Sequence, residues 1–275
     1  MEQLIVGIDI GASKTKAVAV EKSQIIGFTS VQTKNISKSA IRALKMVLLA
    51  ADRRCEDVRK IAISGGGARL IGNTLLELPV IRVDEILALG LGGLELSGKP
   101  QALIVSMGTG TALVIALDKG GRIEHIGGTG VGGGIIEGLS RRMLGIKKFE
   151  KIEEMANRGV ASNVDLTVAE LIGGPIGILP PNATASNFKK LNADTDKNDV
   201  AAAIFNMVAE VIGVITVMAT KAYHLEKDIV LVGKIIQSIK IAELIRNLMK
   251  IFQIDVCIPS NGEYCVAIGA VKSII

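Results

Sequence analysis

The 275-residue sequence has no tryptophan and only two tyrosines and five phenylalanines. Proteins that bind nucleic acids by base stacking need exposed aromatic rings, so this scarcity argues against that class of function. A core with so few aromatics must be built from Ile, Val, Leu and Ala, as in α/β proteins with buried sheets. Since 49% of the residues are apolar and 21% are charged, we expect a soluble globular protein. Its length allows about two domains.

The sequence is also poor in cysteine and in clustered charge. Its three cysteines, Cys55, Cys257 and Cys265, are odd in number and show no CxxC spacing. This pattern indicates reduced thiols in the cytoplasm and excludes a disulfide framework, a zinc site and an iron–sulfur site. The net charge of +5 is spread along the chain, which favours solvated helix faces over a nucleic-acid patch.

No membrane segment or signal peptide is expected. The apolar run near the N-terminus is interrupted by Gly7 and Asp9, which is atypical of a signal peptide. The most membrane-like stretch, Phe205–Ala219, contains Glu210 and is too short to span a bilayer. We therefore interpret it as a buried helix.

The order of predicted elements repeats. Strands are predicted at Leu4–Ile10, Ala17–Glu21, Gln24–Thr29, Lys60–Ser64, Val80–Val83, Ala102–Ser106, Ala112–Leu117, Arg122–Ile126 and Ile229–Val232. Helices are predicted at Ser37–Arg53 (with Ser37 or Ser39 as N-cap), Asp84–Leu96, Ile135–Leu144, Ala201–Tyr223 and Ala267–Ile275. Each half of the chain begins with a β-hairpin that carries a Gly/Thr turn, which predicts a duplicated fold of two α/β lobes with a cleft between them. The Ser97–Pro100 cluster divides these halves into 1–98 and 99–275.

The first hairpin turn has the residue types that bind phosphate. Gly11, Ala12, Ser13 and Thr15 offer backbone N–H groups, small side chains and hydroxyls. Asp9 precedes the turn, where a carboxylate could hold hydrated Mg²⁺. The alternative is a purely structural β-turn beside a surface aspartate.

The second hairpin, Gly108-Thr109-Gly110-Thr111, follows the same logic. Two such loops, one at the head of each half, are more specific for a nucleotide than either alone. The sequence contains no GxxxxGK[ST] motif, and no GxGxxG opens a helix after the first strand. A P-loop enzyme and a Rossmann dehydrogenase are therefore disfavoured.

Taken together, the two hairpins resemble the phosphate-binding elements of the acetate kinase/sugar kinase/Hsp70/actin superfamily. Further collinear stretches resemble type II pantothenate kinases: Ser64–Ala68, Val83–Ile86, Gly127–Gly134 with Glu137–Leu139, Asp165–Val168, Ala185–Phe188 and Ala267–Ala270. The likeness runs from about residue 4 to the C-terminus. It implies a duplicated ribonuclease H-like (actin/Hsp70-like) two-lobed kinase fold.

The resemblance also implies a function and partners. It points to ATP- and Mg²⁺-dependent phosphorylation of the pantothenate 4′-hydroxyl in coenzyme A biosynthesis. It further implies a cytoplasmic homodimer, with the helical stretch Ala201–Tyr223 at its interface. An internal core helix would have the same apolar period as that stretch.

Site residues follow from the resemblance position by position. Glu85 matches the catalytic base, and a carboxylate is the group needed to accept a proton from an attacking hydroxyl. Asp84 is its rival, and either residue could instead be a carboxylate that interacts with the helix dipole. The matched nucleotide- or phosphate-binding residues are Gly11, Ala12, Ser13, Lys14, Thr15, Lys16, Gly108, Thr109, Gly110, Thr111 and Gly233, and the matched substrate-binding residues are Thr109, His125 and Gly127.

Several positions depart from the family pattern. Ala12 replaces a usual glycine, Lys14 stands where Leu is frequent, and Lys234 stands where a second glycine is common. His125 occupies the position of an arginine that contacts the pantothenate carboxylate, and a neutral imidazole cannot form a bidentate fork. Arg122 could compensate for the missing arginine, but it lies three residues before His125 on a strand and should therefore face the opposite side of that strand from His125.

These departures leave three hypotheses open. The first is a pantothenate kinase, and the second is a kinase of the same fold that acts on another small alcohol. The third is a regulatory ATPase of the dehydratase-activator type.

Overall fold

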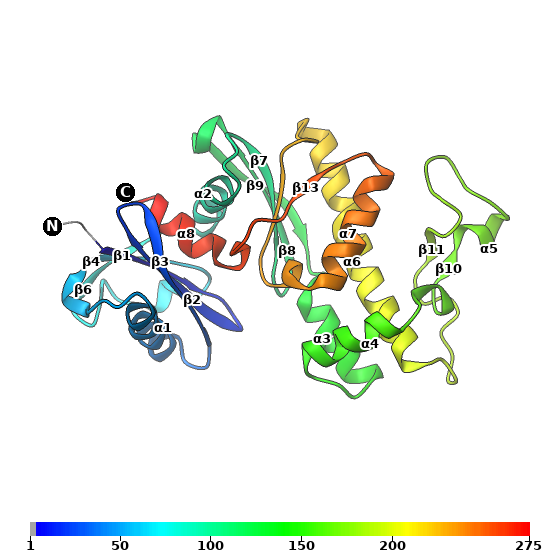
Figure 1. Cartoon of the computed structure of the whole chain (residues 1–275), viewed down its shortest axis with the longest axis horizontal. Helices are drawn as coiled ribbons and strands as arrows, with labels where there is room; N and C mark the ends of the chain where they lie inside the picture. Colours follow the sequence, from blue (N-terminus) through cyan, green and yellow to red (C-terminus); the bar gives the residue numbers. More distant parts are fainter. Residues whose placement is uncertain (1–3) are drawn as a thin grey trace. The chain divides into compact units, whose positions relative to one another are not determined.

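The computed structural model describes residues 4–275, which form two compact units (Figure 1). The first unit contains the chain up to Ile104 together with Val114–Ile126 and Pro259–Ile275, and the second contains Val105–Leu113 and Gly127–Ile258. This grouping differs from a division into 1–98 and 99–275, because the C-terminal residues belong to the first unit.

A six-stranded sheet of order β3-β2-β1-β4-β6-β5 forms the centre of the first unit. Its strands are β1 (Leu4–Ile10), β2 (Lys14–Glu21), β3 (Gln24–Gln32), β4 (Val58–Ser64), β5 (Thr74–Leu75) and β6 (Leu78–Arg82). The first three strands form an antiparallel meander, while β4 pairs in parallel with β1 and with β6. The predicted strands of this half are confirmed, with ends shifted by a few residues.

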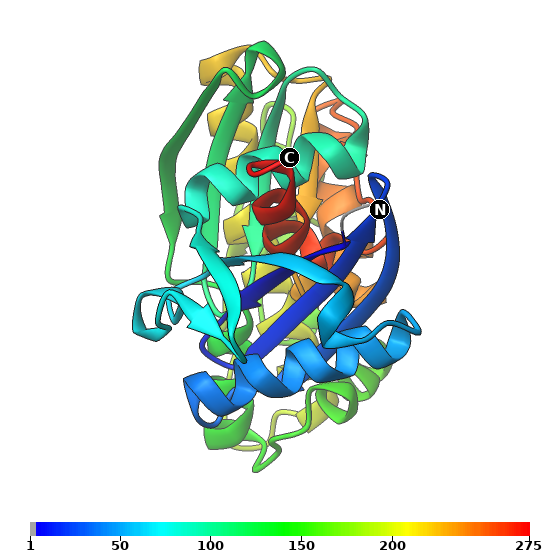
Figure 2. The ribbon, with the colours of Figure 1, turned by 90° about the vertical axis from the view of Figure 1, so that its left-hand side faces the viewer.

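Both faces of this sheet are covered by helices, as its apolar strands require. Alternate residues such as Leu4, Val6 and Ile8 pack with α1 (Ile36–Ala50). Ile5 and its face neighbours pack with α8 (Cys265–Lys272) instead. Figure 2 shows the blue α1 and the red α8 on opposite faces of the blue strands.

Glycines allow α8 to approach both the sheet and α2 (Glu85–Ser97) closely. A β-carbon at Gly7 of β1 would lie 2.2 Å from the Ala267 carbonyl oxygen. One at Gly269 of α8 would lie 1.7 Å from the Ala88 carbonyl oxygen. The bare backbone at these positions therefore sets the spacing of the β1–α8–α2 layers.

The second sheet repeats the strand order of the first. It has the order β13-β12-β7-β8-β9 and comprises β7 (Ala102–Met107), β8 (Thr111–Leu117), β9 (Arg122–Thr129), β12 (Ile229–Val232) and β13 (Val256–Cys257). From β9, the order β9-β8-β7-β12-β13 corresponds strand for strand to β3-β2-β1-β4-β6. The predicted duplication is thereby confirmed.

Outside its part of this sheet, the second unit is mainly helical. They are α3 (Gly133–Met143), α4 (Phe149–Arg158), α5 (Val168–Ile172), α6 (Lys197–Tyr223) and α7 (Ile239–Ile251), with a short hairpin of β10 (Leu166–Thr167) and β11 (Thr184–Ser186). By length and composition α6 could cross a membrane, but 67% of its most apolar 18-residue stretch is buried within the protein. It is the buried helix predicted around Phe205–Ala219.

The predicted N-cap of α1 is wrong. Asn35 caps the helix, with its Oδ1 accepting a hydrogen bond from the Lys38 N–H at 3.0 Å. The Ser39 hydroxyl instead donates to the Gln32 carbonyl oxygen at 3.2 Å. Asparagine is as good an N-cap as serine, and α1 consequently begins at Ile36, before Ser37.

Candidate active site

The β1–β2 hairpin closes on the predicted phosphate-binding turn. The Gly11 N–H donates to the Lys14 carbonyl oxygen at 3.1 Å, and the Ser13 carbonyl oxygen accepts from the Thr33 N–H at 3.0 Å. The side chains of Ala12 and Ser13 are exposed. This leaves a tight turn with small side chains at its surface, which suits the approach of an anion.

Thr15 does not contribute its side chain to that surface. Strand β2 begins at Lys14, so Thr15 is already part of the strand and its side chain points to one face of the sheet. Its side chain is buried, and its hydroxyl lies 2.9 Å from the Thr33 hydroxyl. The predicted phosphate contact by the Thr15 hydroxyl is therefore corrected to a structural bond between β2 and the end of β3.

Asp9 and Lys16 face each other across the same hairpin. They are register partners in the β1–β2 ladder, which places their side chains on one face of the sheet. Asp9 is buried, and this burial raises its pKa to about 6. The positive charge of Lys16 opposes the rise, and the negative charge of Glu85 adds to it. Asp9, Lys16 and Glu85 are thus close enough to interact electrostatically.

The first turn of α2 assigns different tasks to its two acidic residues. Asp84 is the N-cap, and its Oδ1 accepts a hydrogen bond from the Leu87 N–H at 2.9 Å. Glu85 begins the helix, and its pKa is raised by partial burial and by the neighbouring charge of Asp84. The helix is thus capped by Asp84, and the raised pKa of Glu85 is a property that suits a general base.

His125 lies on the side of β9 that faces α2. Ile123 packs against Gly90, and Gly120, earlier in the chain, packs against Leu91. His125 lies two residues after Ile123 and therefore shares its face of the strand.

Arg122 does not take the place of the family arginine. Its guanidinium binds Glu124 on the same face of β9, with Nε to Oε1 at 2.8 Å and Nη2 to Oε2 at 3.0 Å. The alternation of a strand directs this pair to the face opposite His125. The predicted orientation of Arg122 is confirmed.

In the second unit, the β7–β8 turn is bound to the glycine-rich start of α3. The Gly133 and Gly134 N–H groups donate to the carbonyl oxygens of Gly108 and Thr109, each at 2.9 Å. The Thr109 side chain is exposed. The Thr111 hydroxyl instead donates to the Val131 carbonyl oxygen at 2.9 Å, so this hydroxyl stabilises the glycine loop, contrary to the predicted phosphate contact.

Gly233 lies at the end of β12 with a left-handed φ of +98°. A β-carbon there would lie 2.4 Å from the Met107 carbonyl oxygen, so the loop after β12 depends on a glycine. The next residue, Lys234, places its ammonium 5.9 Å from the centroid of the Phe149 ring. Lys234, which stands where a second glycine is common in the family, thus forms a cation–π contact in this chain.

The predicted residues fall into two groups, each described within its own unit. Asp9, Gly11–Lys16, Glu85 and His125 belong to the first unit. The second unit holds Gly108–Thr111, Gly127 and Gly233. Sequence reasoning gave no role to Ser64, which the β1–β4 register places beside Asp9. Its signals in the sequence are its position before three consecutive glycines and its place in the Ser64–Ala68 stretch that resembles the family.

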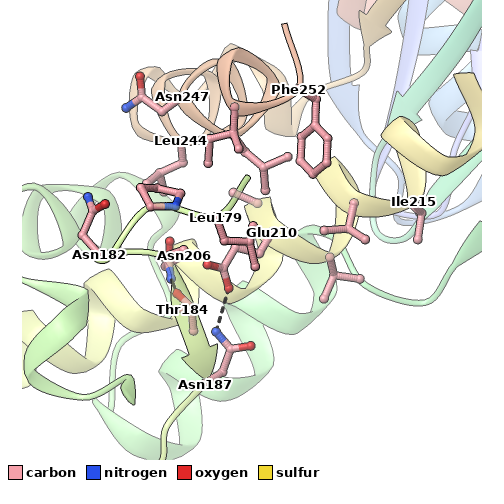
Figure 3. Close-up of a pocket in the computed structure, with 17 residues that line it drawn as sticks. Leu179, Asn182, Thr184, Asn187, Asn206, Glu210, Ile215, Leu244, Asn247 and Phe252 are labelled. Atoms are coloured by element: carbon pink, nitrogen blue, oxygen red, sulfur yellow. Dashed lines mark hydrogen bonds between the residues drawn. The ribbon is translucent and has the colours of Figure 1, made fainter. Parts of the chain in front are cut away.

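The second unit also contains a cavity of about 770 Å³, lined by α6, α7 and the 179–187 segment (Figure 3). At its polar end the Asn187 Nδ2 donates to Glu210 Oε2 at 2.9 Å, and the Asn206 Nδ2 donates to Thr184 Oγ1 at 3.0 Å. Asn206 also donates to the buried Asp165, which accepts from the Phe188 N–H as well. These bonds hold the Ala185–Phe188 segment against α6, and no predicted site residue lines the cavity.

Comparisons with known proteins agree with this architecture. Residues 98–271, which are more than half of the chain, match the Fumble family. A type II pantothenate kinase from Bacillus cereus is 25% identical over 280 residues, covering 98% of each protein.

Two solved structures show the same fold. An activator of the 2-hydroxyisocaproyl-CoA dehydratase from Clostridium difficile, with bound ADPNP, has a TM-score of 0.71 at 13% identity and covers 98% of this chain and 92% of its own. The ROK hexokinase of Thermus thermophilus has a TM-score of 0.58 at 14% identity, with 98% of both chains covered. The predicted actin/Hsp70-like α/β fold class is confirmed.

Proposed function

Because the chain belongs to the Fumble family, that of the type II pantothenate kinases, we propose that it phosphorylates the 4′-hydroxyl of pantothenate with ATP in coenzyme A biosynthesis. Family and fold make it an ATP-dependent kinase, and the acceptor is the proposed part. The observation that carries the proposal is the electrostatic grouping of Asp9, Lys16 and Glu85 in one unit. Phosphoryl transfer needs a positively charged group for the phosphates, a carboxylate that binds the metal cation and a base, and Lys16, Asp9 and Glu85 are proposed for these roles in that order.

Glu85 is proposed as the general base. An attacking alcohol must lose its proton as the new P–O bond forms, and a carboxylate within hydrogen-bond reach orients the hydroxyl and accepts that proton. The raised pKa of Glu85 makes it a better proton acceptor than an ordinary surface glutamate. Asp84 supports this role indirectly, by fixing the helix end that carries Glu85.

The phosphate contacts are proposed for both hairpin turns. In the first, backbone N–H groups of Gly11–Ser13 and the ammonium groups of Lys14 and Lys16 supply positive charge. In the second, the backbone of Gly108–Gly110 and the exposed Thr109 hydroxyl serve the phosphates and the acceptor, with Gly127 beside the acceptor. Gly233 is proposed to lie against the adenosine.

The donor set around Asp9 fits a hydrated Mg²⁺. Within residues 4–275 no three His, Cys, Asp or Glu side chains gather into a metal cage. Mg²⁺ commonly uses one or two carboxylates and keeps several waters and phosphate oxygens. Asp9 supplies such a carboxylate, and the buried Ser64 hydroxyl beside it has no partner in the described structure. When bound, the cation would neutralise charge on the β- and γ-phosphates.

An acceptor other than pantothenate is the second candidate, and His125 is the observation that favours it. An imidazole cannot form the bidentate pair with a carboxylate that a guanidinium forms. The test is ADP release from ATP over a panel of alcohols: pantothenate, pantoate, pantetheine and sugars. Turnover with pantothenate supports the proposal, while turnover confined to another alcohol would replace the acceptor.

The variant His125→Arg sharpens that test. If the acceptor carboxylate binds at this position, the substitution should lower KM for pantothenate about 10-fold with little change in kcat, because a charge-assisted pair replaces a weak contact. His125→Gln is the neutral control. An unchanged KM in His125→Arg would place the carboxylate elsewhere.

A regulatory ATPase is the third candidate, since a dehydratase activator shares the fold. Of the three cysteines, Cys265 is buried, and its burial raises the thiol pKa, which makes it a poor cluster ligand. ATP hydrolysis that no alcohol stimulates, and that survives Glu85→Gln, would favour the ATPase.

We also propose a cytoplasmic homodimer with α6 in its interface. Several apolar side chains of this helix are exposed, among them Val214, Met218 and Tyr223. Met218→Glu should convert a dimer into a monomer in light scattering coupled to gel filtration. A wild-type monomer would refute the interface.

A further inference from the structure

Four polar side chains form a row across the sheet of the first unit. The strand registers pair Ser30 with Lys16, Lys16 with Asp9, and Asp9 with Ser64. Register partners on neighbouring strands point to the same face. The row therefore lies on the face that packs against α8, just beyond the apolar residues of β1 to β4 on that face.

Both ends of this row are hydroxyl groups without a partner. In the described part of the chain, four buried side-chain oxygens form no hydrogen bond, and they belong to Ser30, Ser64, Ser140 and Thr220. Two of these four thus flank the Asp9–Lys16 pair. Buried polar groups are nearly always satisfied, and exceptions commonly mark a position where a water, an ion or a ligand binds.

Ser64 is the more informative of the two. Its side chain is completely buried, whereas that of Ser30 is only partly so. It lies next to the buried carboxylate of Asp9, and its hydroxyl can donate to that carboxylate through a water molecule. A hydroxyl that both donates and accepts can bind a water molecule and fix its orientation.

We propose that Ser64 is a positioning residue for the cation: its hydroxyl binds a water of the hydrated Mg²⁺ that Asp9 holds. This inference depends on the proposed function and adds a residue to it. Groups that hold the ligands of a metal in place commonly affect metal affinity by about 10- to 100-fold when they are removed. Ser64 therefore acts on the cation through water, and its effect should appear only when the cation is present.

The test measures ADPNP binding calorimetrically, once with MgCl₂ and once with EDTA. In the wild type, Mg²⁺ should tighten ADPNP binding. In Ser64→Ala this gain should shrink by about 10-fold, while the affinity measured in EDTA stays unchanged. Electron paramagnetic resonance with Mn²⁺ gives an independent readout, since less Mn²⁺ should be bound to the Ser64→Ala–ADPNP complex at equal concentrations.

Ser140→Ala is the matched control, because it removes another buried unpartnered hydroxyl, on α3, and should leave the Mg²⁺ gain intact. Ser64→Thr keeps the hydroxyl and should restore the gain. If Ser64→Ala fails to fold, Ser64→Cys replaces the hydroxyl by a weak donor of similar size and serves in the same comparison.

Two results would overturn the inference. One is an unchanged Mg²⁺ gain in a folded Ser64 variant without the hydroxyl, and the other is an equal loss of ADPNP affinity with and without Mg²⁺. A wild type that does not bind ADPNP, or that phosphorylates no alcohol, would instead contradict the proposed function.

Discussion

A β-carbon placed on Gly65 would lie 2.5 Å from Oδ1 of Asp9, so the Asp9 carboxylate rests directly against the backbone of residue 65. Gly65 also has a φ of +86°, in the left-handed region that side chains rarely adopt. Position 65 therefore has two independent reasons to be glycine. One is the shape of the turn after β4, and the other is the space that Asp9 occupies.

Gly65→Ala should consequently disturb both stability and the site. We expect the free energy of unfolding to fall by about 2 kcal/mol or more, from the left-handed backbone and the steric clash together. The Mg²⁺-dependent part of nucleotide affinity should fall as well, because Asp9 must move. Denaturant unfolding and calorimetry measure the two effects.

Gly66→Ala is the matched control, since a β-carbon at Gly66 meets nothing within 4 Å. It should leave both stability and binding near those of the wild type. Equal effects of the two substitutions would show that the loop, and not contact with Asp9, is responsible.

Glu85→Gln should lower kcat by about 10²- to 10⁴-fold, the usual contribution of a general base, with nucleotide affinity retained. Asp84→Asn should keep most activity, because asparagine caps a helix as well as aspartate does. Asp84→Ala removes the cap and should lower the free energy of unfolding by about 1 kcal/mol. Loss of kcat in Asp84→Asn but not in Glu85→Gln would exchange the two roles.

Stability should depend on pH through Asp9. In the unfolded chain its pKa is near the ordinary value of 3.8, and in the folded protein it is about 6. Between these values the folded state binds more protons, so stability falls as the pH rises from about 4 to about 6 and then levels off. The loss amounts to about 3 kcal/mol at most.

Asp9→Asn removes this titration and should be more stable than the wild type at pH 7 but not at pH 4. Urea unfolding in EDTA at several pH values measures the difference. The neighbours Lys16, Glu85 and Cys265 stay in place, and Asp194→Asn at an exposed position is the control. A constant difference between pH 4 and pH 7 would contradict the burial of a charged Asp9.

Gly269→Ala should be among the most destabilising substitutions in the first unit. Its β-carbon would lie 1.7 Å from the Ala88 carbonyl oxygen, which cannot move without displacing α2. We expect a loss of about 3 kcal/mol or more, seen as a lower Tm. Gly138→Ala, on an exposed face of α3 with nothing within 4 Å, should raise stability by about 0.5–1 kcal/mol. Similar Tm values for both variants would argue against the close α2–α8 contact.

The sequence predicted the duplicated fold because its two glycine hairpins stand at equivalent points of two βββ units. It could not show that Cys265–Lys272 packs onto the first sheet, because apolar periodicity identifies a helix but not its partner. The sequence alone does not single out Asn35 as the N-cap of α1, because two serines nearby have equal propensity for that position.

The candidate site likewise contains residues that the sequence predicts and residues that only the structure reveals. Asp9 is predicted locally, from a carboxylate beside a glycine turn, whereas Glu85 is predicted from the resemblance to the family, with which its position at a helix start agrees. Thr15 and Thr111 were assigned to phosphate from their residue type, but strand direction and hydroxyl partners turn both away. Ser64 depends on a parallel pairing of β1 with β4, a long-range register that residue pattern does not specify.

The packing of α8 on β1 has a consequence for biosynthesis. Gly7 leaves the ribosome long before its contact partner Ala267, which lies far along the chain. The face of the sheet that carries Asp9 therefore stays uncovered until α8 has been synthesised, while the opposite face can be covered earlier by α1. We expect this face to be prone to misassembly until α8 emerges, and the emergence of α8 to determine when the β1–β2 turn can bind a nucleotide.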